Sequence, residues 1–218
     1  MKQQTIFIIL AGLPLLFSSC RKPDETAPQV TLNGGNVLLF IGGTYSDQGA
    51  VATDNKDGDL TSRIEVTNLV NTTQAGSYTV HYSVTDNAGN EGKADRTVII
   101  KNTAFSFGGS YAVKDSIWGG AVTLYFDSII VSNSVNDRLF TTRFANHIYG
   151  TVYMDLVSSG TMITVPSQAI NCGTPNDLRT FSTPSNGTVG GIPTVIRFNY
   201  QEVNSSGTVN ATATYTAQ

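Results

Sequence analysis

The sequence predicts an all-β protein of two consecutive units. Short runs with every second residue apolar recur along the chain, Gly, Asn and Asp clusters separate them, and no helical repeat is seen. The 218 residues suit two small domains, since a domain usually has about 100 to 200 residues. We place the units at residues 27–101 and 105–218, joined by Asn102-Thr103-Ala104.

The composition excludes several classes of protein. Thirteen Lys and Arg against 16 Asp and Glu give a formal charge of −3, which argues against nucleic-acid binding. Two Cys and two His are too few for a four-thiolate or histidine-based metal site. We therefore expect no cofactor.

The N-terminus has the pattern of an export signal. Lys2 precedes an apolar run over residues 6–17, which is shorter than the roughly 20 residues of a membrane span. Ser18, Ser19 and Cys20 follow, and this ending resembles the lipobox of bacterial lipoproteins, although Phe17 replaces the preferred aliphatic residue. Residues 1–19 are then a signal peptide and Cys20 is the acylated residue. The alternative is ordinary secretion with an incidental cysteine.

Residues 20–26 are expected to form a lipidated, flexible stalk. The pair Asp24-Glu25 resembles the signal by which Bacteroidetes lipoproteins reach the outer face of the outer membrane. The resemblance implies a membrane partner through the lipid and exposure at the cell exterior. Cys172 remains as a lone thiol, expected to be a small buried residue.

The clearest strand of the first unit covers residues 77–85. Tyr78, Val80, Tyr82 and Val84 share one face, whereas His81 falls on the polar face as a solvated residue.

Residues 24–101 resemble the bacterial immunoglobulin-like repeat known from pesticidal crystal proteins and cell-surface proteins. The resemblance implies a seven-stranded Greek-key sandwich that acts as a spacer or adhesion module without a catalytic site. It is carried by Ala27-Pro28, Gly43-Thr44-Tyr45-Ser46-Asp47-Gln48-Gly49-Ala50, Asp57-Gly58-Asp59-Leu60-Thr61, Gly76-Ser77-Tyr78-Thr79-Val80, Asp86-Asn87-Ala88-Gly89-Asn90 and Arg96-Thr97-Val98.

Three carboxylates crowd one loop of this unit, at Asp54, Asp57 and Asp59. Clustered carboxylates suit Ca²⁺, although the spacing does not fit an EF-hand. A distributed Ca²⁺ site that adds Asp47 or Asp86 is one interpretation. The other is turn chemistry, in which Asp side chains accept backbone N–H bonds.

The second unit is predicted to contain eight antiparallel strands. Consecutive strands with short connections favour an up-and-down β-barrel or a flattened sandwich, because closure removes exposed edges. The expected strands are residues 109–114, 123–131, 139–143, 150–156, 161–166, 179–183, 194–203 and 208–216.

This unit is similar to lipocalin-like C-terminal domains of Bacteroidetes surface lipoproteins. The similarity is carried by the segments Phe107-Gly108-Gly109-Ser110-Tyr111, Gly150-Thr151-Val152-Tyr153-Met154-Asp155, Met162-Ile163-Thr164-Val165-Pro166 and Ile196-Arg197-Phe198-Asn199-Tyr200. It implies architecture and location rather than an activity.

No catalytic signature occurs: G-x-S-x-G, H-E-x-x-H, C-x-x-C and phosphate-binding glycine loops are all missing from the sequence. We expect no enzyme. A hidden glycoside hydrolase would need two facing carboxylates, for which Asp127, Asp155 and Asp177 are the candidates.

Aromatic residues of the second unit are candidates for sugar stacking: Trp118, Tyr111, Tyr125, Tyr149 and Tyr153. The alternative, favoured for any one tyrosine, is packing in the core. Trp118 is preferred because Gly119-Gly120 predicts a turn at a rim. Ser116 and Ser128 lie in Asp-Ser-Ile sequences that resemble the O-glycosylation motif of Bacteroides.

The sequence thus favours a non-enzymatic surface lipoprotein that binds a glycan or another surface component. A structural or adhesive protein is the first alternative, and a hydrolase is the second. An exposed aromatic with nearby amides would favour sugar binding. A broad apolar patch would favour adhesion, and two facing carboxyls would favour hydrolysis.

Overall fold

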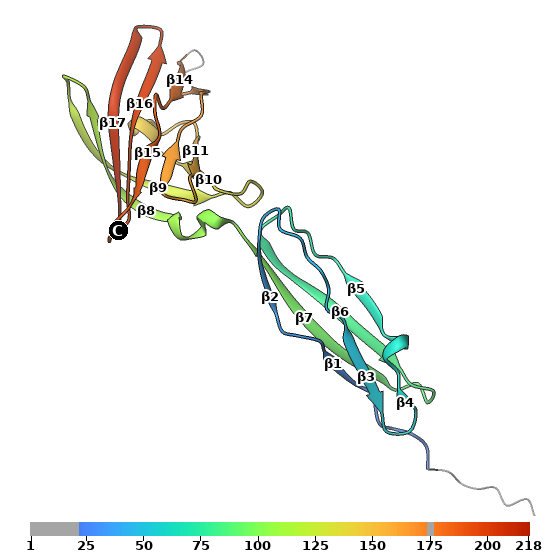
Figure 1. The fold of residues 1–218 in the computed structure, drawn as a ribbon. Coiled ribbons are helices and arrows are strands. Elements are labelled where there is room, and N and C mark those ends of the chain that lie inside the picture. Colours follow the sequence, from blue (N-terminus) through green and yellow to red (C-terminus); the bar gives the residue numbers. More distant parts are fainter. Residues whose placement is uncertain (1–21, 174–176) are drawn as a thin grey trace, which may run out of the picture.

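The computed structural model describes residues 22–173 and 177–218, which form two β-units arranged end to end (Figure 1). Strands β1–β7 form the first unit and β8–β17 the second. The predicted signal peptide and Cys20 lie outside the described residues. In the described part, no helix is long and apolar enough to cross a membrane.

The first unit has seven strands in two sheets, as the resemblance implies. One sheet has the order β1-β3-β4 and the other β2-β7-β6-β5, with β2 parallel to β7. The strands are β1 (Gln29–Leu32), β2 (Val37–Phe40), β3 (Ala50–Asp54), β4 (Gly58–Asp59), β5 (Glu65–Asn68), β6 (Gly76–Thr85) and β7 (Glu91–Lys101). Val80, Tyr82 and Val84 of β6 are buried and His81 is exposed, which confirms the expected alternation.

An arginine lies inside this core. Arg96 of β7 is fully buried and forms an ion pair with Asp47. Its Nη2 donates to the carbonyl oxygens of Asn33 at 2.7 Å and Gly49 at 3.0 Å. The guanidinium also lies 5.5 Å from the ring centroid of Tyr82. Arg96 therefore fastens the segments on both sides of β2 to the four-stranded sheet.

The second unit is a closed barrel, which decides between the two predicted forms. The ring order is β8-β9-β10-β11-β12-β15-β16-β17, and β17 pairs with both β16 and β8. Its strands are β8 (Gly109–Ile117), β9 (Val122–Val131), β10 (Arg138–Thr141), β11 (Val152–Val157), β12 (Met162–Thr164), β15 (Gly187–Gly190), β16 (Val195–Asn204) and β17 (Gly207–Ala217).

Two strands lie outside this ring, β13 (Gln168–Asn171) and β14 (Leu178–Ser182). The expected strand at residues 179–183 is β14, which pairs with β13 and the far half of β16 rather than closing the ring. Its place in the ring belongs to β15, which was not predicted because the sequence Gly-Thr-Val-Gly has little strand signal. A Cβ on Gly187 would lie 2.4 Å from the Arg197 carbonyl oxygen, so glycine permits this close pairing.

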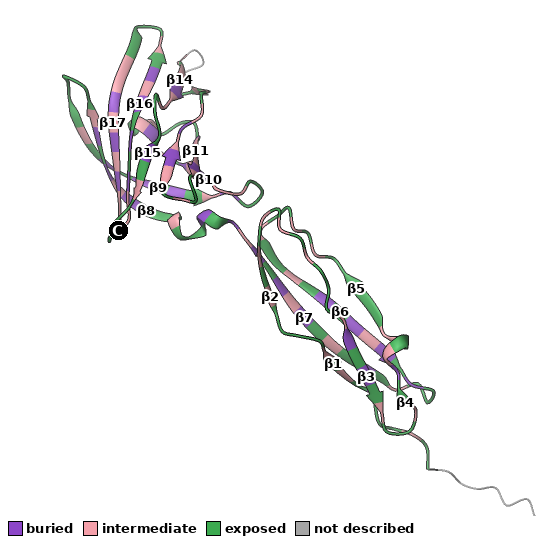
Figure 2. Cartoon of the chain, in the orientation of Figure 1, coloured by how far each residue is buried: buried purple, intermediate pink, exposed green. Residues whose placement is uncertain are grey.

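Large apolar side chains fill much of the barrel, and Figure 2 shows buried positions recurring along its strands. Phe144, from the short helix η3 (Phe144–Asn146), enters this core. Its ring stacks on Phe198 at a centroid distance of 5.9 Å and meets Phe181 and Tyr200 edge-on.

Asn102 ties the two units together. It precedes the short helix η2 (Thr103–Phe107) and is buried. Its Nδ2 donates to the carbonyl oxygens of Ser132 at 2.9 Å and Val135 at 2.8 Å, while Oδ1 accepts from the Asp137 N–H. The loop between β9 and β10 is thus bound to the end of β7. The β8–β9 and β16–β17 turns lie at the opposite end of the barrel (Figure 1).

Arg96→Met is expected to destabilise the first unit by about 3 kcal/mol, because it leaves the Asp47 carboxylate and two carbonyl oxygens without their donor. Urea unfolding with separate probes for each unit measures the free energy. Arg63→Met, on the exposed surface, is the control. A loss below about 1 kcal/mol for Arg96→Met, typical of an exposed ion pair, would contradict the role given to Arg96.

Candidate functional site

The interior of the barrel becomes polar toward the end far from the first unit. Along β8 the inward positions are Tyr111, Val113 and Asp115, and along β16 Phe198 and Tyr200 are followed by Glu202. Since inward positions alternate along a strand, both acids point into the barrel. They line a pocket of about 280 Å³, here called the mouth pocket. Its other lining residues include Ile117, Ala145, Asn146, His147, Arg179, Tyr200, Asn204 and Val209.

Asp115 is the most unusual group in the mouth pocket. Only 6% of the residue is exposed, and its Oδ2 accepts a 2.7 Å hydrogen bond from the Tyr200 hydroxyl. Its Oδ1 is buried and receives no hydrogen bond of good geometry from the described residues. Burial raises the pKa of Asp115, and the nearby charge of Glu202 raises it further.

Glu202 is held by several donors. Its Oε1 accepts from Arg179 Nη1 and from Asn204 Nδ2, and its Oε2 lies 3.5 Å from His147 Nε2. Burial alone would raise the pKa of Glu202, but hydrogen bonds from His147, Asn204 and Arg179 lower it to about 2. Arg179 also makes a two-point ion pair with Asp177, at 2.9 and 3.0 Å.

A strained loop carries one wall of the mouth pocket. Ala145 and Asn146 have φ values of 50° and 61°, in the left-handed region that non-glycine residues seldom occupy. Phe144 anchors the loop in the core, and His147 then lies beside Glu202. Backbone strain of this kind persists only where the surroundings impose it, and it is often found at binding sites.

The two carboxyls of the mouth pocket have opposite pKa shifts, a pattern that also occurs in glycoside hydrolases. However, Oε1 of Glu202 already accepts from Arg179 and Asn204, and His147 Nε2 lies 3.5 Å from its Oε2. The geometry therefore suits ligand binding better than hydrolysis.

The acids named from the sequence are engaged elsewhere. Asp127 accepts from the backbone N–H groups of Thr142 and Arg143 at 2.9 and 2.8 Å. Asp155 makes a two-point pair with Arg138, and Asp177 one with Arg179. Each is thus committed to a structural contact.

The candidate aromatics separate into two groups. Tyr111 and Tyr125 occupy inward positions and are only 2% and 7% exposed, so the core alternative holds for them and they are not surface ligand contacts. Tyr153 is half-buried, with the Arg138 guanidinium 3.9 Å from its ring centroid. Trp118 and Tyr149 are 56% and 58% exposed. The structure does not bring the five together.

Trp118 lies at the β8–β9 turn, on the outside of the barrel rim. Its Nε1 donates to Thr212 Oγ1 at 3.0 Å, and Thr212 donates to Asn199 Oδ1 at 2.8 Å. The next outward pair along β16 and β17 is Gln201 and Asn210, whose side-chain amides are bonded at 3.0 Å. Trp118, Asn199, Asn210 and Thr212 are here called the rim surface.

The outer face of β9 is mostly apolar, with Ser128 as its one polar outward residue. Val122, Leu124, Phe126 and Ile130 are all more than half exposed, and they form what we call the β9 row.

The predicted Asp cluster is mostly turn chemistry. Asp54 Oδ1 accepts hydrogen bonds from the backbone N–H groups of Lys56 and Asp57. Asp57 Oδ2 accepts one from the N–H of Asn87, and Asp59 Oδ1 accepts one from the N–H of Thr61. Among the described residues, the carboxylates that lie together are those of Asp54, Asp24 and Asp86, within 4.8 Å. This corrects the grouping with Asp57 and Asp59. Lys56 Nζ already lies 3.5 Å from Asp24 Oδ1.

The two Asp-Ser-Ile serines occupy outward positions of the barrel. Ser116 of β8 is half-buried and Ser128 of β9 is exposed. Their modification stays a prediction.

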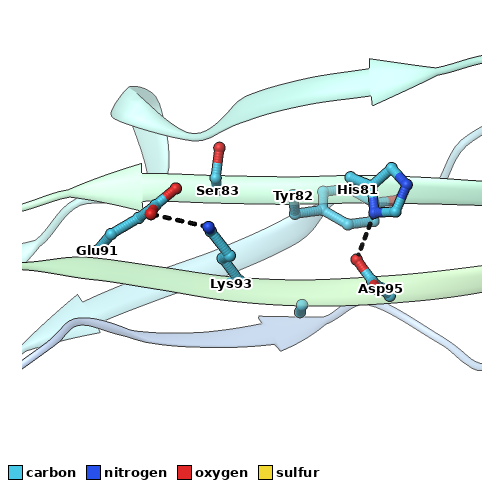
Figure 3. Close-up of a pocket in the computed structure, with 7 residues that line it drawn as sticks. His81, Tyr82, Ser83, Glu91, Lys93 and Asp95 are labelled. Atoms are coloured by element: carbon cyan, nitrogen blue, oxygen red, sulfur yellow. Dashed lines mark hydrogen bonds and ion pairs between the residues drawn. The ribbon is translucent and has the colours of Figure 1, made fainter.

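The first unit has an open hollow on the outer face of β6 and β7 (Figure 3). His81 and Asp95 form one pair across it and Lys93 and Glu91 another, at 2.8 Å each. All four side chains are largely exposed, so these pairs are weak surface contacts.

Asp115→Asn is expected to raise the melting temperature of the barrel at neutral pH. A pKa raised by folding means that ionisation of Asp115 opposes folding as the pH rises through the folded pKa. The advantage of the variant should therefore shrink toward and below pH of about 3.9, the ordinary value for aspartate. Calorimetry over a pH series measures this, with Asp155→Asn as the control for loss of an ion pair. A variant less stable than the wild type at neutral pH would mean that the Asp115 carboxylate has a stabilising partner.

Comparison with known proteins identifies the first unit. Residues 30–100 match the family model described as "Bacterial surface protein, Ig-like domain". A search of curated proteins found no match.

Among solved structures, a lipoprotein from Bacteroides thetaiotaomicron is 15% identical, with 86% of this chain and 98% of that chain covered and a TM-score of 0.36. The CBM51-2 domain in complex with GlcNAc, with INT domains, of ZmpB from Clostridium perfringens is also 15% identical, with 86% and 43% covered and a TM-score of 0.29. Scores this low carry no argument about ligand or activity. The firm similarity is thus that of residues 30–100 to bacterial surface protein Ig-like domains.

Proposed function

We propose that this protein is a lipid-anchored, cell-surface glycan-binding protein without enzymatic activity. The first unit acts as a spacer, and the barrel binds the glycan at its rim surface. The observation that carries the proposal is the exposed indole of Trp118 with amides beside it.

The rim surface has the chemistry that sugar rings require. An exposed aromatic face stacks on the C–H face of a pyranose, while amides and hydroxyls bond its hydroxyl groups. The hydrogen bond from Trp118 Nε1 to Thr212 restrains the indole before a ligand arrives, so less entropy is lost on binding. The side-chain amides of Asn199 and Asn210 carry both donors and acceptors.

The position of the rim surface supports its proposed exposure at the cell surface. The blue start of the described chain and the β16–β17 turn lie at opposite ends of the molecule (Figure 1). The bonds of Asn102 fasten the barrel to the spacer. A lipid on Cys20 would then hold the spacer end at the membrane and direct the rim outward.

The contacts of four carboxylates support the proposed absence of catalysis. Glu202, Asp127, Asp155 and Asp177 all accept hydrogen bonds from protein donors, which is typical of structural rather than catalytic acids.

The β9 row favours a second function, adhesion to a protein. Contiguous exposed apolar side chains mark protein contacts more often than sugar sites. Substitutions in the rim surface and in the β9 row distinguish glycan binding from adhesion to a protein.

Trp118→Ala is expected to abolish glycan binding and leave stability within about 1 kcal/mol, because the side chain is mostly solvated. A glycan array identifies the ligand, and calorimetry then measures its affinity, expected to be on the order of micromolar to millimolar. Tyr149→Ala, an exposed aromatic outside the rim surface, is the matched control. No glycan bound by the folded wild type, or binding lost with Phe126→Ser and kept with Trp118→Ala, would favour the adhesive function instead.

Cys20→Ala is expected to release the protein from the membrane fraction, since acyl chains are the proposed anchor. Fractionation of cells and intact-mass measurement of the mature protein test this. Retention of the variant in washed membranes would contradict the lipoprotein assignment and leave glycan binding as a separate question.

A further inference from the structure

We propose that the mouth pocket is a second binding site, which takes the ammonium group of a small organic amine. This goes beyond the proposed function, because the pocket lies inside the barrel and Trp118 lies on its outer wall.

The first observation is the unpartnered oxygen of Asp115. A buried acceptor without a donor costs about 1 to 3 kcal/mol, and more when it is charged. The residue is more than nine-tenths buried, its Oδ1 is buried with it, and Asp115 is one of the residues that line the mouth pocket. A ligand that donates an N–H to Oδ1 would remove this cost.

The second observation is the charge around the pocket. Asp115 and Glu202 line it, and Asp177 is bound to the far side of Arg179. Arg179 is the only Arg or Lys among the lining residues in the described part of the chain, and it is shared between two carboxylates. His147 also lines the pocket, with its Nε2 3.5 Å from Glu202 Oε2. Negative groups thus exceed the fixed positive one, which favours a cation over a neutral or an anionic group.

The third observation is the shape and polarity of the pocket. A volume of about 280 Å³ admits a ligand of monosaccharide size. Ile117 and Val209 are apolar lining residues, whereas Asn146 and Asn204 are polar ones, with the Asn204 amide already bonded to Glu202 and Ser206. Such a lining suits a compact ligand with one cationic group, a few hydroxyls and an apolar face.

An ammonium group fits better than a guanidinium or a metal ion. Its three N–H donors can reach Asp115 Oδ1 and a second acceptor at once, without demanding a planar carboxylate fork. A hard divalent ion would need about six oxygen ligands, and Glu202 is already committed to Arg179 and Asn204.

Calorimetric titration with glucosamine, glucose and glucuronate tests the proposal on the purified protein near neutral pH. The three sugars are of similar size and differ in charge. We expect glucosamine to bind at least about tenfold more tightly than glucose, and glucuronate to bind most weakly. Asp115→Asn keeps the shape and the bond to Tyr200, and should reduce glucosamine affinity about tenfold with little effect on glucose. Asp155→Asn is the control.

Equal binding of glucosamine and glucose, no binding of glucosamine, or an unchanged affinity in Asp115→Asn would each overturn the proposal. Trp118→Ala should leave glucosamine binding unaltered, so failure of this site and failure of the rim surface are distinguishable. Competition between glucosamine and ethanolamine distinguishes amino sugars from acyclic amines as the ligand class. Tighter binding of glucosamine assigns amino sugars and tighter binding of ethanolamine assigns acyclic amines, and both outcomes support the proposal.

Discussion

Pairing of β17 with both β16 and β8 closes the barrel and fixes every other feature of its far end. In this register Asp115 lies opposite Ala213, and Tyr200 lies opposite Ala211. Both alanines point inward and are buried. Because they are small, the Tyr200 hydroxyl can cross over β17 to reach Asp115.

The same closure creates the rim surface on the outside. Asn199 and Thr212 are direct partners across β16 and β17, and Gln201 and Asn210 are the next outward pair. Trp118 joins them because its backbone N–H continues the ladder, donating to the Asn210 carbonyl oxygen at 3.0 Å. One strand therefore contributes small residues to the inside and polar residues to the outside. Figure 1 shows that this end faces away from the spacer.

Much of this fold could be predicted from alternation, yet most of the site could not. The long strands β6, β9, β16 and β17 have clear period-two patterns, whereas β13 and β15 are four residues each and depend on neighbours for their pairing. Asp115 and Glu202 did carry a signal: each is an acid in the apolar phase of its strand. That they share one pocket depends on the barrel register, which no local pattern reveals. The same holds for Tyr111 and Tyr125, whose inward orientation follows only once the ring is known.

An NMR titration of the purified protein with the glycan found by array tests the central claim most directly. The chain has one tryptophan, so its indole N–H gives a single resonance that belongs to Trp118. Glycan binding at the rim should shift this signal together with the side-chain amides of Asn199 and Asn210, saturably and with one affinity. Shifts confined to the β9 row, with the indole signal unmoved, would contradict the account.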